Sequence, residues 1–245
     1  MVEIPQKIKE LLIEEVSVAV LTGAGISAES GVPTFRGKDG FWKQHRAEEL
    51  ATVDAFMSDP ELVWGWYQYR RGIVNGVEPN PGHFALALME KAIEDFTLIT
   101  QNVDNLHARA GSTDILELHG NIHRNKCIKC GAVYNKEVDD NQKEVPECEC
   151  GGMIRPDVVW FGEMLPQQTL QSAFEAAERA ELFFSIGTSA IVQPAASLPI
   201  AAKRHGACLV EINVESTMLT GYADEFLQGA SGEILPIIIK ECGFE

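Results

Sequence analysis

Basic residues are scarce in this 245-residue chain: 20 lysines and arginines stand against 36 aspartates and glutamates, for a net charge of −16. Tight nonspecific binding to nucleic acid needs basic surface that replaces counterions, so we expect no direct nucleic-acid binding. No apolar run reaches about 18 residues, the length that a membrane-spanning helix needs. Residues 1–10 contain charges and a proline instead of the apolar core of a signal peptide. We therefore expect a soluble cytoplasmic protein with no membrane partner.

Hydrophobic residues are plentiful by contrast, at 45% of the chain, and the length allows one large domain or one domain with a smaller insert. Short apolar runs of strand length alternate with segments of helical spacing. Such alternation predicts an α/β fold, with a mostly parallel sheet and helices on both faces. The expected strands are 16–21, 96–99, 115–118, 182–186 and 207–212, and the expected helices are 4–15, 60–74, 83–94, 167–179 and 195–205.

A glycine-rich loop follows the first expected strand. Gly23, Ala24 and Gly25 come at its end and precede an expected helix, an arrangement that brings backbone N–H groups against a pyrophosphate. Small residues also satisfy ordinary tight turns, so the motif alone leaves that simpler role open. Phe35 and Arg36 add a ring and a fixed cation, which suits a phosphate-bearing ligand with a flat ring. Ligands bind beyond the carboxyl ends of parallel strands, so further candidate loops begin at Thr100, His119, Gly187 and Asn213.

Polar side chains follow the next two expected strands. Gln101, Asn102 and Asp104 can bond an amide, a ribose or a water, although Asn102 or Asp104 could equally be a helix cap. His119 ends the strand at 115–118, where a catalytic group would face the ligand, and Gly120 beside it is expected to let the ligand approach. A lone histidine is more often structural. The rivals of His119 are His107 and His123.

Four of the six cysteines lie in the polar segment 124–155, as Cys127-x-x-Cys130 and Cys148-x-Cys150 with seventeen residues between the pairs. A glycine follows each pair and permits the tight turn that lets two sulfurs converge on one ion. Four thiolates form a closed tetrahedral zinc site, which is structural because no position remains for substrate. Two disulfides or a redox Cys-x-x-Cys are the alternatives, and an intracellular location disfavours the disulfides.

Together these motifs resemble the sirtuin family over residues 16–239. The resemblance implies NAD-dependent removal of acyl groups from protein lysines, and one structural zinc ion. It implies a Rossmann-like domain made of 1–37, 81–123 and 157–245, and a small domain made of a helical insert at 38–80 and a zinc ribbon at 124–156. The matching pieces are 23–27, 31–36, 100–104, 118–120, the four cysteines, 159–163, 187–189 and 212–213.

The resemblance also implies roles for individual residues. The acyl oxygen of the modified lysine attacks C1′ of the nicotinamide ribose as nicotinamide leaves, and His119 then acts as general base on a ribose hydroxyl. Water completes the reaction, giving free lysine and O-acyl-ADP-ribose. Asn102 and Asp104 are implied to be catalytic residues, which form the nicotinamide pocket and position a water molecule there. The residues implied to contact NAD, besides those two, are Gly23, Ala24, Gly25, Ser27, Ala28, Thr34, Phe35, Arg36, Trp42, Gln101, Val103, Gly187, Thr188, Ser189, Asn213, Val214, Glu215 and Ala230.

An acylated lysine within an extended substrate peptide is implied to pair with Val159, Trp160, Phe161 and Gly162. The segment 66–71 is similar to that of sirtuins acting on succinyl- and malonyl-lysine. This similarity implies that Tyr67 and Arg70, three residues apart on one helix face, bind the carboxylate of the acyl group. The small side chain of Ala51 would leave space for that group. A helix with an aromatic stripe against the core would have the same pattern.

Three other functions remain open from the sequence. A dehydrogenase would need an acidic ribose ligand after a second strand about 20 residues further on, and the segment around Phe41 does not predict that strand. An ADP-ribosyltransferase would apply the same NAD chemistry to another acceptor. A noncatalytic zinc-ribbon binding module would explain the cysteines but not the loops.

Overall fold

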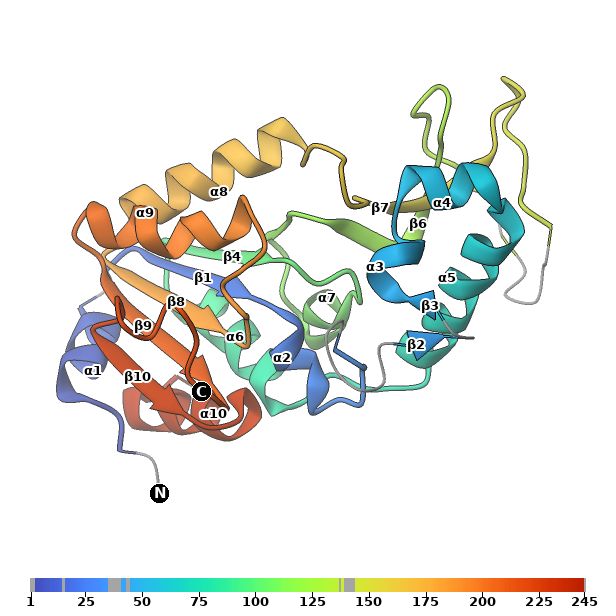
Figure 1. Cartoon of the computed structure of the whole chain (residues 1–245). Helices are drawn as coiled ribbons and strands as arrows, with labels where there is room; N and C mark the ends of the chain where they lie inside the picture. The colour runs from blue at the N-terminus through green and yellow to red at the C-terminus, as the bar shows by residue number, and fades with distance from the viewer. Residues whose placement is uncertain are drawn as a thin grey trace.

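The computed structural model describes residues 3–14, 16–34, 41–42, 45–136, 138 and 144–244. Phe35 and Arg36 lie outside the described residues, and of Trp42 only the backbone is described. Figure 1 shows a larger lobe built on one sheet and a smaller lobe of helices and short strand pairs. Each lobe contains segments from distant parts of the chain. The segment boundaries given above stay a prediction.

The larger lobe contains a six-stranded sheet in the order β10-β9-β8-β1-β4-β5, in which every neighbouring pair is parallel. The central strand β1 is buried along its whole length, as its apolar, β-branched sequence predicts. Thr22, its last residue, is in register with Thr100 and Ile186, so three loops leave the sheet at one level. The strands are β1 Val18–Thr22, β4 Phe96–Thr100, β5 Ile115–Glu117, β8 Leu182–Ile186, β9 Cys208–Asn213 and β10 Glu225–Gln228.

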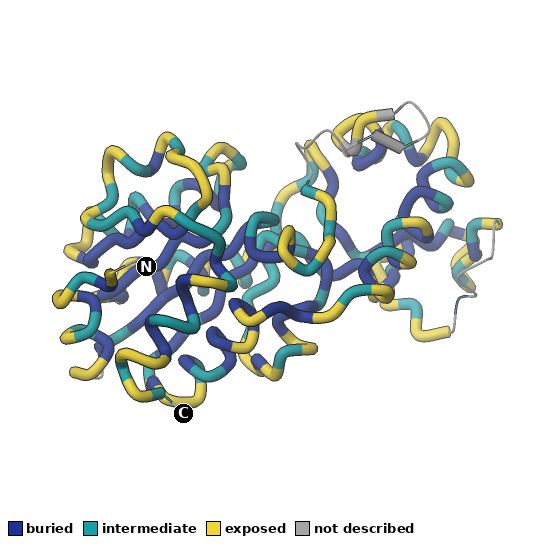
Figure 2. The backbone as a smooth tube through the Cα atoms, turned by 90° about the horizontal axis from the view of Figure 1, so that it is seen from below, coloured by how far each residue is buried: buried dark blue, intermediate teal, exposed yellow. Residues whose placement is uncertain are grey.

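Helices cover both faces of this sheet, which confirms the predicted fold class (Figure 1). Side chains of α1, α6 and α10 form one core with alternate strand residues, and α8 and α9 form the other core on the opposite face. Figure 2 shows the strands as buried tube inside a rim of exposed turns. The helices are α1 Gln6–Ile13, α2 Ala24–Ala28, α6 Pro81–Ala92, α7 Leu106–Ala110, α8 Gln167–Arg179, α9 Leu198–Arg204 after the 3₁₀ turn Ala195–Ser197, and α10 Ser231–Cys242.

All five predicted strands are present in this sheet, with ends shifted by at most two residues. The strand β10 and the helix α10 were not predicted. β10 is a four-residue edge strand with one buried residue, so its sequence lacks a clear apolar run. α6 begins at Pro81, earlier than predicted, because Asn80 caps it by accepting the Gly82 N–H.

The smaller lobe packs three helices against an antiparallel strand pair, and its core contains Phe56, Trp66, Tyr67 and Trp160. β2 and β3 form a two-residue antiparallel pair instead of a strand of the main sheet, as expected for a chain that is not a dehydrogenase. Within the described residues, no helix has both the length and the apolarity to cross a membrane. The elements are β2 Phe41–Trp42, β3 His45–Arg46, α3 Ala47–Leu50, α4 Val53–Ser58, α5 Pro60–Asn75, β6 Gly120–Cys127 and β7 Ile154–Val158.

Candidate active site and zinc centre

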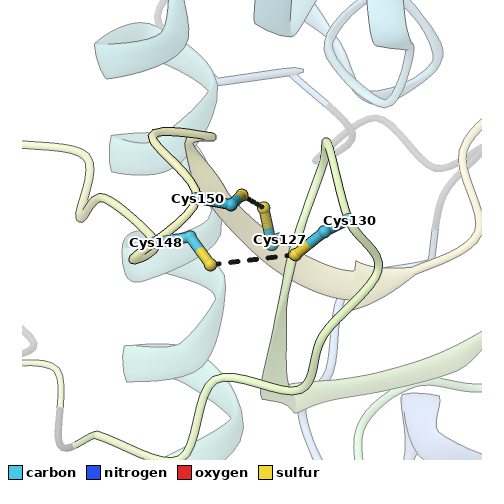
Figure 3. A group of neighbouring side chains, drawn as sticks. All are labelled: Cys127, Cys130, Cys148 and Cys150. Carbon is cyan, nitrogen blue, oxygen red and sulfur yellow. Dashed lines mark hydrogen bonds between the residues drawn. The ribbon is translucent and has the colours of Figure 1, made fainter.

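Four sulfur atoms converge at the tip of the β6–β7 pair (Figure 3), all within 4.8 Å of one another. The Cys127 and Cys150 sulfurs are 3.5 Å apart, and the Cys130 and Cys148 sulfurs are 3.8 Å apart. A tetrahedral ion with Zn–S bonds of about 2.3 Å places its sulfurs about 3.8 Å from one another. All four cysteines are free thiols, so the disulfide alternative is wrong. The spacing fits one zinc ion with four thiolate ligands and no open position.

Two glycine turns bring the sulfurs together. Gly131 and Gly151 have φ of +71° and +72°, and each donates its N–H to the carbonyl of the first cysteine of its turn, Cys127 at 3.0 Å and Cys148 at 2.8 Å. A residue with a Cβ rarely adopts this backbone conformation. A Cβ on Gly152 would lie 2.7 Å from the Cys127 sulfur, so the second turn has no space for a larger residue.

A cavity of about 560 Å³ lies at the carboxyl edge of the large sheet and extends to the smaller lobe. It is lined by nearly every described residue that was predicted to form the site. Ala28, exposed at the end of α2, and Ala230, which precedes α10, are outside this lining. The predicted residues that line the cavity are Gly23, Ala24, Gly25, Ser27, Thr34, Tyr67, Arg70, Gln101, Asn102, Val103, Asp104, His119, Val159, Trp160, Phe161, Gly162, Gly187, Thr188, Ser189, Asn213, Val214 and Glu215.

The glycine loop after β1 packs directly against the loop after β8. Gly23 donates its N–H to the Ile186 carbonyl at 3.0 Å, and Gly25 donates to the Gly187 carbonyl at 2.8 Å. A Cβ on Gly25 would lie 2.6 Å from the Gly187 Cα, so neither glycine tolerates a side chain. These two N–H groups are therefore engaged within the protein, and the glycines allow the two loops to meet under the cavity. Gly23, Ala24 and Gly25 line that cavity, and the contact of this loop with a pyrophosphate stays a prediction.

His119 faces the cavity in a defined tautomer. Its Nδ1 lies 2.9 Å from the Gln101 carbonyl oxygen, which can only accept, so Nδ1 carries the proton and Nε2 keeps its lone pair. Burial lowers the pKa of His119, although the bond to Gln101 opposes that shift. The imidazole is therefore neutral near pH 7 and able to accept a proton.

Gly120 has a different role from the one expected. Its φ is +81°, and a Cβ there would lie 2.1 Å from the Asp157 carbonyl oxygen on β7. The glycine is required by the close pairing of β6 with β7, and not by a ligand.

The loop after β4 is fixed by two side chains. Asn102 donates from Nδ2 to the Gly23 carbonyl at 3.0 Å and to the Ser27 hydroxyl at 3.1 Å, which ties it to the glycine loop. Asp104 accepts the Leu106 N–H at 3.0 Å and so caps α7, the structural role that the sequence left open for it. Burial raises the pKa of Asp104, while hydrogen bonds and the charge of Arg70 oppose the shift. Both side chains also line the cavity, so capping does not exclude a role toward a ligand.

A buried pair of histidines beneath this loop was not predicted as part of the site. The His83 Nε2 lies 3.4 Å from the Ser27 hydroxyl, and the His107 Nε2 lies 2.9 Å from the Thr22 hydroxyl. The two rings meet edge to face at 4.9 Å. Burial lowers the pKa of His83 to about 4 and that of His107 to about 3, so both are neutral supports of the loops. The sequence offered His107 only as a rival of His119 and did not single out His83 for the site.

The smaller lobe contributes an aromatic wall. Tyr67 and Trp66 are buried in its core, as the simpler interpretation of the aromatic stripe predicts. Tyr67 also lines the cavity, together with the buried Ala51 and with Arg70, which is half-buried. The Trp160 indole N–H donates to the Tyr67 hydroxyl at 2.8 Å. The helix α5 thus faces the core and the cavity at once.

A parallel sheet with its ligand cavity at the carboxyl edge and a zinc ribbon on a second lobe defines the class: a dinucleotide-binding α/β protein with a structural metal. The Sir2 family model matches residues 23–194, about two thirds of the chain. The chain belongs to the Sir2 family.

Individual relatives agree with this assignment. NAD-dependent protein deacylase 2 of Pyrobaculum aerophilum is 50% identical over 236 residues, which cover 96% of this chain and 94% of the relative. The crystal structure of a Sir2 homolog–NAD complex has a TM-score of 0.92 and 44% identity, covering 99% of this chain and 95% of the other. A Sir2 complex with a p53 peptide and NAD⁺ has a TM-score of 0.85 and 35% identity, covering 99% of this chain and 100% of the other.

Proposed function

We propose that this chain is an NAD-dependent protein-lysine deacylase that removes acetyl groups and also acyl groups ending in a carboxylate, such as succinyl and malonyl. The family and the named deacylase relative support the reaction. The carboxylate preference is supported by one observation: Tyr67 and Arg70 line the same cavity as His119. NAD is the co-substrate, and zinc has a structural role in the ribbon.

His119 is the general base of this proposal. The Gln101 carbonyl holds its Nδ1–H, so Nε2 is directed to remove a proton from a ribose hydroxyl of NAD once nicotinamide has left. Asn102 and Asp104 contact the nicotinamide group in this proposal. Hydrogen bonds to Ser27 and Leu106 fix the two side chains in position. The acyl carbon is then bonded to the ribose oxygen, and one water molecule releases the lysine amine, so the products are free lysine, nicotinamide and O-acyl-ADP-ribose.

The substrate peptide pairs with residues 159–162 in this proposal, as in other strand-addition modes. The N–H groups of Val159, Trp160 and Phe161 already bond to His119, Glu163 and Ala51 within the protein. A substrate strand therefore pairs through carbonyl groups of this segment and through Gly162. The named complex with a p53 peptide is consistent with a peptide substrate.

The acyl end is recognised by two donors. The Tyr67 hydroxyl accepts the Trp160 N–H, so its own proton is available to a carboxylate. Burial raises the pKa of Tyr67 to about 12, which keeps that proton in place at neutral pH. Burial lowers the pKa of Arg70, but Tyr67 and Asp104 oppose the shift, and a guanidinium stays charged at neutral pH.

The test is a set of peptides that differ only in the acyl group on one lysine, assayed with and without NAD. Arg70→Met is expected to lower kcat/KM for the succinyl peptide roughly tenfold to a hundredfold more than for the acetyl peptide, because a charge-assisted hydrogen bond is lost. Arg179→Met is the matched control, since Arg179 pairs with Asp95 on the surface, away from the cavity lining. An unchanged succinyl-to-acetyl ratio in Arg70→Met would refute the carboxylate assignment. A mass increase on a target protein would instead indicate ADP-ribosyl transfer.

A further inference from the structure

Arg155 and Glu163 form an ion pair beside the acyl pocket for which the reaction gives no role. The Arg155 Nη1 lies 2.5 Å from Glu163 Oε1, and Nη2 lies 2.8 Å from Oε2, so the pair is bidentate. Arg155 is only 2% exposed and also donates to the Val158 carbonyl at 2.6 Å. A buried guanidinium stays charged and is costly to desolvate, so partners such as these compensate the buried charge.

This pair holds Trp160 from two directions. Glu163 Oε2 accepts the backbone N–H of Trp160 at 2.8 Å, and the Arg155 guanidinium lies 3.3 Å from the centroid of the Trp160 ring. The ring also contacts Phe56 at a centroid distance of 5.2 Å. Trp160 is 1% exposed, so its indole has no space for another orientation.

The orientation of Trp160 matters because its indole N–H donates to the Tyr67 hydroxyl at 2.8 Å. That bond occupies a lone pair of the hydroxyl oxygen and thereby limits the directions in which the hydroxyl can donate. An acyl carboxylate uses the Tyr67 donor, whereas an acetyl group has no carboxylate to receive it.

We propose that the Arg155–Glu163 ion pair is a specificity-positioning element, which fixes Trp160 so that the Tyr67 hydroxyl is directed at the carboxylate of the acyl group. The inference rests on the proposed carboxylate preference. Arg155 and Glu163 act through Trp160 in this proposal, and Glu163 also lines the cavity.

The experiment measures the ratio of kcat/KM for succinyl- and acetyl-lysine in one peptide sequence at saturating NAD. Glu163→Gln keeps the shape of the side chain but removes its charge, and it is expected to lower the ratio about tenfold. In a Tyr67→Phe background the same substitution is expected to leave the ratio unchanged, because the donor that it positions is already gone. Trp160→Phe, which removes the indole N–H, is a second route to the same loss.

Asp95→Asn is the matched control, because it breaks the Arg179 ion pair on the surface and is expected to leave the ratio unchanged. A merely structural role for Glu163 would lower kcat/KM for both peptides by the same factor, which overturns the proposal. An effect of Glu163→Gln on the ratio that persists in Tyr67→Phe overturns it too, because the pair would then act by another route. The proposed function fails separately, when Arg70→Met leaves the ratio unchanged.

Discussion

At the scale of single residues, hydrogen-bonding partners decide which histidine can act as a base. His119, His83 and His107 are all largely buried, and burial lowers the pKa of each. His83 and His107 place their Nε2 atoms against Ser27 and Thr22 hydroxyls, below the cavity. His119 uses Nδ1 for the protein, so only its Nε2 remains directed at the cavity.

The first prediction concerns the protonation of His119. Because burial lowers its pKa, the base form persists as the pH falls below 6.5, and kcat is expected to decline only at lower pH. His119→Ala is expected to lower kcat by roughly 10²- to 10⁴-fold. Steady-state release of nicotinamide with an acetyl peptide, measured across pH, checks both statements. His205→Ala, at an exposed site, is the control, and an acid limb centred above pH 6.5 would contradict the prediction.

At the scale of elements, the zinc ribbon is the part of the molecule whose shape depends least on apolar packing. Its cluster of core residues is small, with Trp64, Cys127 and Ile154 at its centre. The metal therefore replaces a hydrophobic core in holding the two cysteine turns together. β7 carries Arg155 and leads into the segment 159–162, which lines the cavity, so the ribbon supports this wall of the cavity.

The second prediction follows from this dependence on metal. Metal analysis is expected to find about one zinc per chain. Cys148→Ser is expected to lose zinc, to lower the melting temperature and to reduce peptide binding, because the ribbon unfolds locally. Cys242→Ser, in α10, is the control, since that cysteine lies away from the cluster. A metal-free chain that stays folded and fully active would disprove a structural role.

At the scale of the whole molecule, the chain forms two lobes (Figure 2), each with its own core. Residues of both lobes line one cavity. Loops that follow the strands of the sheet line one side of this cavity, and Tyr67 and Arg70 of the smaller lobe line another. The buried His83 and His107 contact each other, and they lie against the Ser27 and Thr22 hydroxyls of the larger lobe. Their protonation is therefore linked to the stability of the whole fold.

The third prediction is a loss of stability in mild acid. Both histidines have folded-state pKa values, about 4 and about 3, below the ordinary 6.5, so the unfolded chain binds more protons as the pH falls below 6.5. Stability is fully present above pH 6.5 and declines toward the folded pKa values. Each histidine is expected to lower the free energy of unfolding by about 2 kcal/mol between pH 7 and pH 5. Urea unfolding with zinc in excess measures the change, and His107→Gln should reduce the pH dependence. Equal unfolding free energies at both pH values would contradict the linkage.

Sequence patterns were enough to predict the alternating strands and helices, the four zinc ligands and most of the residues that line the cavity. These features are local: a strand is an apolar run, a metal turn is a cysteine spacing, and a ligand loop follows a strand end. The edge strand β10 was not predicted because only one of its residues is buried, so its sequence has little apolar pattern.

Features that depend on contacts between distant segments became visible in the folded chain. Gly25 and Gly120 must be glycines because a Cβ would collide with Gly187 in the first case and with Asp157 in the second. Both partners are far away in the sequence, so no local pattern predicts them. The tautomer of His119 follows from the Gln101 carbonyl, and the orientation of Trp160 follows from Arg155, Glu163 and Phe56. The physical reason is that packing and hydrogen-bond geometry are properties of pairs of segments, whereas the sequence pattern describes one segment at a time.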